Sequence, residues 1–162
     1  MKRKHIFHIL VLALIFWMAL IFSFSAQNSD QSASLSGEVG RKVASIFVPG
    51  FQTWEERRQD QFVEKIDFLV RKTAHFTEYM VLGMLWLLCL QSNPKGRFTM
   101  RQTMWIGISA SACFAMSDEF HQLFVAGRAG RWMDVGIDTA GAITGVCLVG
   151  IGIKIIKNVR KY

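Results

Sequence analysis

Residues 6–22 read IFHILVLALIFWMALIF, a run without Asp, Glu, Lys or Arg. Three later runs also lack these four residue types, at 79–94, 103–117 and 139–153. With a few flanking residues, each run reaches the length of about 20 residues at which a helix crosses roughly 30 Å of hydrocarbon. The sequence therefore predicts an all-α integral membrane protein, a four-transmembrane-helix bundle with spans at about 6–24, 73–90, 103–120 and 134–153.

The length of the chain suits a single membrane domain over residues 1–162. A basic start followed by an apolar run also fits a secretory signal peptide. However, this apolar run is longer than the usual signal core, and a cut after Ala26 would place bulky Phe24 where a small residue is preferred. We therefore expect the first span to be kept as an anchor.

The distribution of Lys and Arg predicts the orientation. Ten of the 19 basic residues lie in the N-terminal tail, the connection 95–101 and the tail after residue 153, with no acidic residue among them. By the positive-inside rule, these segments are cytoplasmic. We expect a multi-pass protein of the bacterial plasma membrane with cytoplasmic N- and C-termini. The net charge of +7 then reflects contact with anionic lipid, and without a nucleic-acid-binding motif no nucleic acid partner is expected.

The outer loop, residues 25–72, is predicted to carry one or two amphipathic helices. Apolar residues repeat at helical spacing within 39–47. Thr53 and Glu56 match a capping box at the start of a second helix, which either runs on into the second span or bends near Arg71. These helices are expected to lie on the membrane surface with their apolar faces down, or merely to cover the bundle.

Two further patterns concern the last two spans. Thr99 and Gln102 match a second capping box, at the start of the third span. Gly141 and Gly145 form a small-xxx-small pair that allows two helices to approach closely. We expect this face of the fourth span, including Gly152, to pack inward.

Ionisable side chains gather at one end of the last three spans, and all of them map to the outer interface. Such groups are costly at membrane depth and are usually paired or functional. Helical spacing places His75 and Glu78 on one face, and turns Glu119 about 100° away from Asp118. Asp138 is only about 6 Å below the start of its span. The pattern predicts a shallow, outward-facing polar site rather than a channel, with Lys72, His75, Glu78, Asp118, Glu119, His121, Gln122, Arg128, Arg131, Asp134 and Asp138 as binding residues.

Four motifs in these segments resemble the VanZ family of small bacterial membrane proteins. They read KTAHFTEYMVLG (72–83), SDEFHQLF (117–124), GRAGRWMDV (127–135) and DTAG (138–141). The resemblance covers nearly the whole chain, with one departure at Ala126, where members often carry Pro. It implies a VanZ-like four-span layout. Because the founding member is associated with low-level resistance to teicoplanin, a lipid-tailed glycopeptide antibiotic, it also implies a role in antibiotic tolerance at the cell envelope.

The resemblance brings no agreed mechanism, and two non-catalytic interpretations of the site stay open. In the first, an ion-paired scaffold, basic side chains neutralise the acidic ones and hold the helices together. In the second, the site binds membrane lipid, lipid-linked cell-wall material or an amphiphilic glycopeptide at the outer leaflet. Arg128 and Arg131 would suit phosphate or carboxylate, because the guanidinium group is a planar fork of donors.

A third interpretation is an intramembrane hydrolase or transferase acting on a lipid-linked substrate, by acid–base or metal-dependent chemistry. His75 or His121 would act as general base, oriented by Glu78 or Asp118. The spacing His75-x-x-Glu78 reverses the Glu-x-x-His of di-metal bundles and is not diagnostic. The sequence therefore leaves open whether the protein is an enzyme, and we expect no cofactor and no resident metal.

Overall fold

The computed structural model describes residues 2–96 and 98–160. Its elements in chain order are α1 (Lys2–Ser25), α2 (Ser29–Phe47), the short 3₁₀ turn η1 (Phe51–Thr53), α3 (Glu56–Ser92), α4 (Met100–Gln122) and α5 (Trp132–Val159). The described part contains no strand, which confirms the prediction of an all-α protein. Arg97 and Lys161, two of the basic residues behind the predicted orientation, lie outside the described residues.

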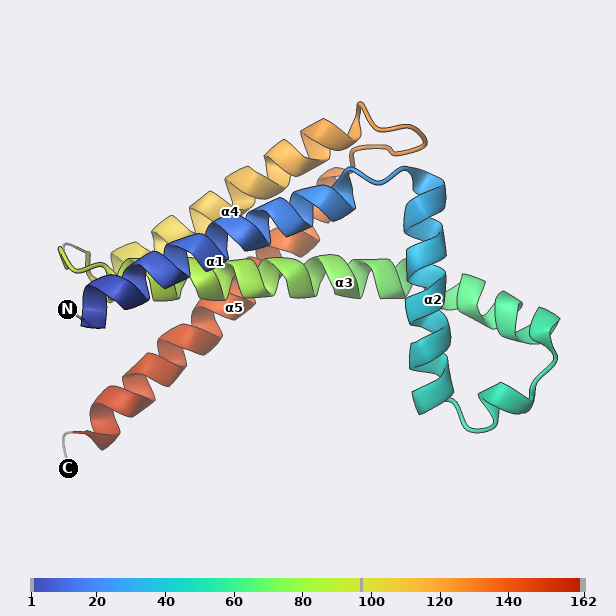
Figure 1. Ribbon diagram of the computed structural model, residues 1–162, viewed down its shortest axis with the longest axis horizontal. Helices are drawn as coiled ribbons and strands as arrows, with labels where there is room; N and C mark the ends of the chain where they lie inside the picture. Colours follow the sequence, from blue (N-terminus) through green and yellow to red (C-terminus); the bar gives the residue numbers. More distant parts are fainter. Residues whose placement is uncertain (1, 97, 161–162) are drawn as a thin grey trace.

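Helices α1, α3, α4 and α5 form a bundle, and α2 lies crosswise beyond the end of α1 (Figure 1). Both termini and the connection between α3 and α4 lie at one end of the bundle (Figure 1). The end of α1, the end of α4 and the connection between α4 and α5 lie at the other end. A chain that crosses a membrane an even number of times has both ends on the same side, which matches this arrangement.

Within residues 2–96 and 98–160, three helices are long and apolar enough to cross a membrane, namely α1, α3 and α5. Helix α4 has 23 residues, which is sufficient length, but polar side chains near both of its ends lower its hydropathy. Three of the four predicted spans therefore fall in helices suited to a membrane, and a crossing by α4 stays a prediction.

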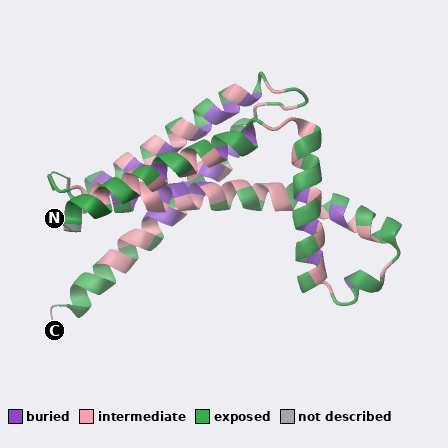
Figure 2. Cartoon of the chain, in the orientation of Figure 1, coloured by how far each residue is buried: buried purple, intermediate pink, exposed green. Residues whose placement is uncertain are grey.

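Helix α1 exposes large apolar side chains along most of its length. Leu12 and Phe16 are each 67% exposed, whereas Leu14 and Ile21 are buried. Figure 2 shows exposed residues along this helix from end to end. A helix that is apolar all round is typical of a membrane span.

The closest helix contact in the bundle is the seam between α3 and α5. A Cβ atom added at Gly141 would overlap the Phe76 carbonyl, and one added at Gly145 would overlap the Met80 carbonyl. The predicted small-xxx-small contact is therefore confirmed. The inclusion of Gly152 was wrong, because α5 diverges from the bundle there (Figure 1) and a Cβ at this position would meet nothing within 4 Å.

Helix α3 is continuous, so the second outer helix runs directly into the predicted span without a bend at Arg71. It does not begin with the predicted capping box. The Thr53 hydroxyl instead donates to the Gly50 carbonyl within η1 at 2.8 Å, and the N-cap Glu55 makes no side-chain cap. The second capping box is confirmed, since Thr99 and Gln102 exchange hydrogen bonds at the start of α4.

Helix α2 is amphipathic, as predicted, but it packs on α3 through small residues. Ser36, Gly40 and Ala44 are buried, one turn apart, and the Ser36 hydroxyl donates to Asp67. The apolar residues of α2 lie outside this contact. We call them the apolar stripe: Leu35, Val39, Val43, Ile46 and Phe47, all exposed by 39% or more.

Candidate functional site

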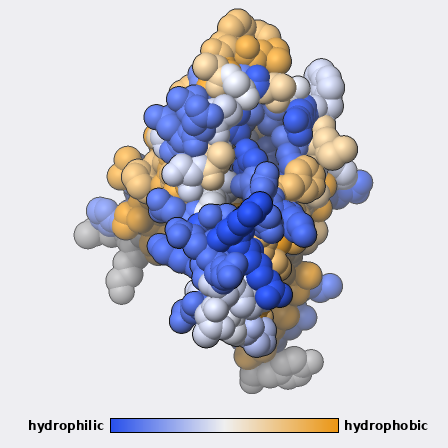
Figure 3. Space-filling view, turned by 90° about the vertical axis from the view of Figure 1, so that its right-hand side faces the viewer, coloured by the Kyte–Doolittle hydropathy of each residue, from blue (hydrophilic) through white to orange (hydrophobic). Residues whose placement is uncertain are grey.

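The polar residues predicted from the sequence gather where α1, α4 and α5 meet the middle of α3. Asp118 and Asp138 are almost completely buried, at 1% and 0% exposed. Glu119, Gln122 and Asp134 are also buried. Figure 3 looks at the side of the molecule where α2 and the start of α3 face the viewer, and shows hydrophilic residues over its centre with hydrophobic patches around them.

One ion pair of the predicted set forms across the site, between Lys72 and Asp134. Arg71 pairs with Asp67, one turn earlier on α3, rather than with an acidic residue of the site. Among the described residues, no Lys or Arg lies within ion-pair distance of Asp118, Glu119 or Asp138. The charge neutralisation that a scaffold would require is therefore present at only one position.

The two arginines of the α4–α5 connection have different environments. Arg128 is half-buried, and its Nε donates to the Gln27 carbonyl at 3.1 Å. Burial and the nearby charge of Arg71 lower the pKa of Arg128. The side chain of Arg131 is exposed, while its backbone N–H donates to Glu119 Oε2 at 2.7 Å.

Several buried polar atoms of the site have no hydrogen-bond partner within residues 2–96 and 98–160. They include both carboxylate oxygens of Asp118, both of Asp138, the Tyr79 hydroxyl and His75 Nδ1. His75 Nδ1 lies 3.7 Å from Asp138 Oδ1, beyond hydrogen-bond distance. Buried polar groups nearly always have partners, so a cluster of unpartnered ones calls for a functional explanation.

Two cavities adjoin this cluster. We call the first the apolar slot; it has a volume of about 300 Å³. Its apolar wall comes from α1, α2 and α3, and its polar end holds Arg71, His75, Glu78, Asp118 and Arg128. We call the second the basic cleft; it has a volume of about 160 Å³ and is lined by residues that include Arg71, Lys72, His75, Gln122, Arg128, Arg131 and Asp134.

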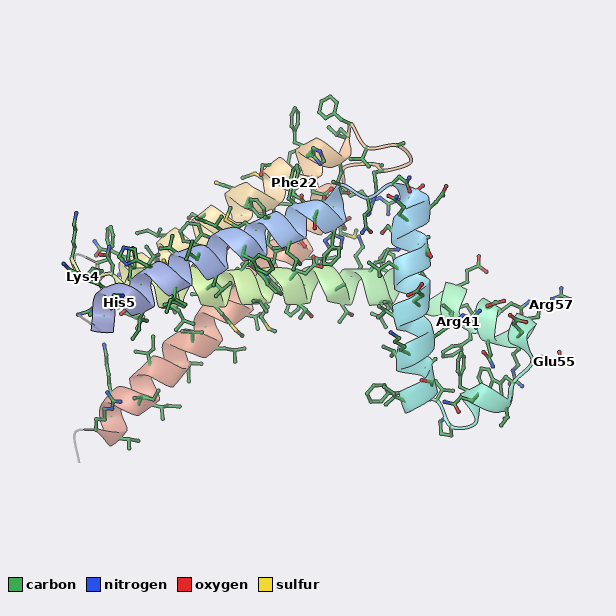
Figure 4. All side chains as sticks on the ribbon, in the orientation of Figure 1. Lys4, His5, Phe22, Arg41, Glu55 and Arg57 are labelled. Atoms are coloured by element: carbon green, nitrogen blue, oxygen red, sulfur yellow. The ribbon has the colours of Figure 1, made fainter. Side chains whose placement is uncertain are left out.

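The structure separates three of the predicted residues from these cavities, since neither the slot nor the cleft is lined by His121, Glu119 or Asp138. The ring of His121 packs on Phe22, with centroids 4.5 Å apart, and His121 lines neither cavity. Figure 4 places Phe22 on the last part of α1, far from Lys4 and His5 at the other end of that helix. Glu119 faces away from Asp118, as expected, and lines a separate cavity beside Trp132.

Tyr79 and Arg71 belong to the site but are missing from the predicted binding residues. Tyr79 is fully buried among the acidic residues, one helical turn after His75. That i, i+4 spacing, with a hydroxyl inside an apolar run, was the signal that would have found it. Arg71 shares the face of His75 and lines both cavities.

The predicted catalytic pairs are not in hydrogen-bonding contact. His75 is nearest to Asp138 rather than to Glu78, and His121 Nδ1 is buried without a partner in the described part of the chain. Within that same part, no three His, Cys, Asp or Glu side chains are arranged to hold a metal ion.

Fold and site together define a helical bundle with membrane-span-like helices and a buried polar site at one end. The sequence model of the VanZ/LLP1 family matches residues 10–153 of this chain. The protein therefore belongs to the VanZ/LLP1 family, as the motifs indicated, and the matched segment contains every predicted site residue. No curated protein and no solved structure matched the chain in the corresponding comparisons.

Proposed function

We propose that this protein is a four-span protein of the bacterial plasma membrane, with both termini cytoplasmic. Its polar site faces outward, where it binds lipid or lipid-linked cell-envelope material and thereby confers tolerance to teicoplanin-like glycopeptides. The tolerance part of the proposal rests on membership of the VanZ/LLP1 family together with the resemblance described above.

The positions of charged residues support this orientation. Arg3 and Lys4 begin α1, and Lys154 and Lys157 lie in the last turns of α5, at the end of the bundle opposite the polar site (Figures 1 and 4). With these residues in the cytoplasm, the polar site lies at the outer leaflet, where lipid headgroups and cell-wall precursors are found.

The buried carboxylate of Asp118, which lines the apolar slot and has no hydrogen-bond partner among the described residues, carries the binding proposal. Asp138 also lacks a partner but lines neither cavity, so it acts on the site through His75, 3.7 Å away. A scaffold gains nothing from buried charges that lack partners, because burying an unpaired charge costs free energy. A binding site tolerates that cost, because the ligand supplies the missing partners. The neighbouring cavities give such a ligand room to reach Asp118.

Replacing His75 by alanine tests the proposal in cells. We expect His75→Ala to return teicoplanin susceptibility to that of cells without the protein, because His75 lines both cavities. The matched control is Thr77→Ala, two residues later on the same helix, where the exposed hydroxyl bonds only to the Thr73 carbonyl. The measurement is the inhibitory concentration of teicoplanin, at equal amounts of each variant in the membrane.

Two results would count against the proposal. One is full tolerance in cells that carry His75→Ala. The other is a loss of tolerance that follows a loss of folded protein in the membrane, which would support the scaffold interpretation instead.

The approach of His75 to Asp138 favours one alternative, an acid–base hydrolase or transferase acting on a lipid-linked substrate. A carboxylate behind an imidazole orients the ring and stabilises its protonated form. In this alternative His75 is the general base and Asp138 is its positioning residue, 3.7 Å away. Turnover of a lipid-linked phosphate ester by the purified protein, abolished in His75→Ala, would establish it.

A further inference from the structure

We propose that the ligand is a lipid phosphate that reaches the site sideways from the bilayer, between α1 and α2. Its phosphate occupies the basic cleft and the first part of one hydrocarbon tail occupies the apolar slot. This inference rests on the proposed binding function and adds the chemical class of the ligand and its path.

The basic cleft has the composition of a phosphate site. Arg71, Lys72, Arg128 and Arg131 line it, and Asp134 is the one acidic residue among its lining residues. Asp134 is already paired with Lys72, and Arg71 is paired with Asp67 outside the cleft. Arg128 and Arg131 therefore supply the positive charges of the cleft that have no acidic partner among the described residues. Guanidinium groups bind phosphate oxygens through two parallel hydrogen bonds.

Arg71 and Arg128 line both cavities, and each guanidinium group keeps N–H donors free for a ligand. Arg128 uses its Nε on the Gln27 carbonyl, and Arg71 uses one terminal nitrogen on Asp67. Each guanidinium carries five N–H donors. A phosphate between Arg71 and Arg128 would supply an acidic partner to Arg128, which has none among the described residues.

The apolar slot extends from the same arginines toward the lipid. Its apolar wall consists of Ile21 and Phe24 of α1, Leu35 and Val39 of α2, and Val70 and Ala74 of α3. Leu35 and Val39 begin the apolar stripe, which continues along the exposed face of α2 to Phe47. A hydrocarbon chain in the slot therefore has continuous apolar contact out to the bilayer.

The cavity volumes decide between ligand classes. The slot is about 300 Å³ and the cleft about 160 Å³, at or below the lower limit of sites for drug-sized molecules. A glycopeptide is too large for either cavity. A phosphate group with the first part of one chain fits, because the rest of the lipid stays in the bilayer.

Glu78 and Asp118 line the slot, as Arg71 and Arg128 do, but not the cleft, and their carboxylates do not suit phosphate. Their carboxylates accept hydrogen bonds, so they suit a hydroxyl or an amine next to the phosphate. Lipid phosphates that carry a hydroxyl-bearing headgroup meet both requirements. Phosphatidylglycerol is therefore the probe of choice.

Photolabelling of the full chain in lipid nanodiscs tests the proposal. The probe is phosphatidylglycerol with a photoreactive group in its acyl chain, and labelled peptides are identified by mass spectrometry. Labelling of peptides around Phe24 and Leu35 reports on the slot. Labelling around Ile151 and Ile155, exposed on α5 away from both cavities, reports on the surrounding lipid and serves as the internal reference.

We expect Leu35→Trp to lower slot labelling about tenfold, equivalent to about 1.4 kcal/mol of binding free energy. Leu35 is 42% exposed, so the larger side chain fills the slot without entering the core. Ile46→Trp is the matched control on the same helix; Ile46 is 74% exposed and lines neither cavity. Val39→Trp provides a second blocked variant if Leu35→Trp does not fold.

Two further arms separate phosphate recognition from tail recognition. Photoreactive diacylglycerol, which lacks phosphate, should label the slot about tenfold less than the phosphatidylglycerol probe does, and Arg128→Gln should remove this preference. Soluble glycerol 1-phosphate should fail to displace the probe, because it has no tail for the slot.

Three results would overturn the inference. Unchanged slot labelling in Leu35→Trp would rule out entry between α1 and α2. Equal labelling by diacylglycerol would rule out recognition of the phosphate. Full displacement by glycerol 1-phosphate would rule out a contribution of the hydrocarbon tail to binding. If any of these occurs while His75→Ala still abolishes teicoplanin tolerance, the proposed function stands and only the lipid phosphate is rejected.

Discussion

Replacing Gly145 by alanine is expected to destabilise the folded bundle by about 3 kcal/mol, the upper part of the usual range for overpacking a core. The added methyl group would overlap the Met80 carbonyl of α3. The obstacle is backbone rather than a flexible side chain, so the two helices must move apart. Thermal unfolding of the purified protein in detergent measures the effect.

Gly152→Ala is the matched control, because it makes the same chemical change seven residues later on the same helix. A Cβ there meets nothing within 4 Å. We expect this variant to gain about 0.5–1 kcal/mol, since alanine favours a helix interior over glycine by that amount. Equal changes in stability for Gly145→Ala and Gly152→Ala would contradict the close contact between α3 and α5.

Replacing Asp138 by asparagine is expected to abolish function while raising stability by up to about 3 kcal/mol, because the amide is neutral and cannot leave an unpaired charge buried. Asp138 is completely buried, and neither carboxylate oxygen has a hydrogen-bond partner in the described part of the chain. Residues kept at such a cost are typical of functional sites, where stability is exchanged for activity. Unfolding temperature and teicoplanin tolerance, measured on the same variant, test both halves.

Asp134→Asn, one turn earlier on the same helix, is the control with the opposite expected sign. Asp134 pairs with Lys72, and both side chains are mostly buried. Removing the carboxylate leaves the Lys72 charge without its partner and should cost up to about 3 kcal/mol. If Asp138→Asn is destabilised like Asp134→Asn, the scaffold interpretation is correct and the binding site is not.

The helices were predictable because their signals are long and local. Apolar runs without charge predicted α1, the second half of α3, and α5. The Thr99–Gln102 box predicted the start of α4, and the glycine spacing predicted the contact surface of α5. The start of α3 was predicted incorrectly, because the Thr53 hydroxyl can satisfy either a helix N-terminus or a 3₁₀ turn, and sequence does not decide between them.

The sequence predicted which residues form the site, but it did not predict which of them contact one another. Helical spacing correctly turned Glu119 away from Asp118. The same spacing also contains the ion pair of Asp67 and Arg71, one turn apart on α3, which was not predicted. Spacing could not show that His75 approaches Asp138 or that His121 packs on Phe22. Each of these results depends on how two elements sit relative to each other, which the periodicity of one helix does not contain.

The two cavities lay beyond sequence reasoning for the same reason. The apolar stripe of α2 was visible from its spacing, but its role depends on which face of α2 meets α3. The small residues Ser36, Gly40 and Ala44 make that contact and leave Leu35 and Val39 for the slot. The sequence pattern predicted only that the apolar face of this helix lies on the membrane surface or covers the bundle.

The proposed function requires that the ends of α1 and α4 and the start of α5 meet at the outer surface of the membrane. Cysteine labelling of intact cells with a membrane-impermeant maleimide tests it most directly, in a variant whose three native cysteines, Cys89, Cys113 and Cys147, are replaced. Ala129→Cys places a thiol at the basic cleft, and Lys95→Cys places one at the opposite end of the bundle. We predict that Ala129→Cys reacts in intact cells and that Lys95→Cys reacts only after the cells are opened. Labelling of Lys95→Cys in intact cells, with Ala129→Cys protected, would contradict the account.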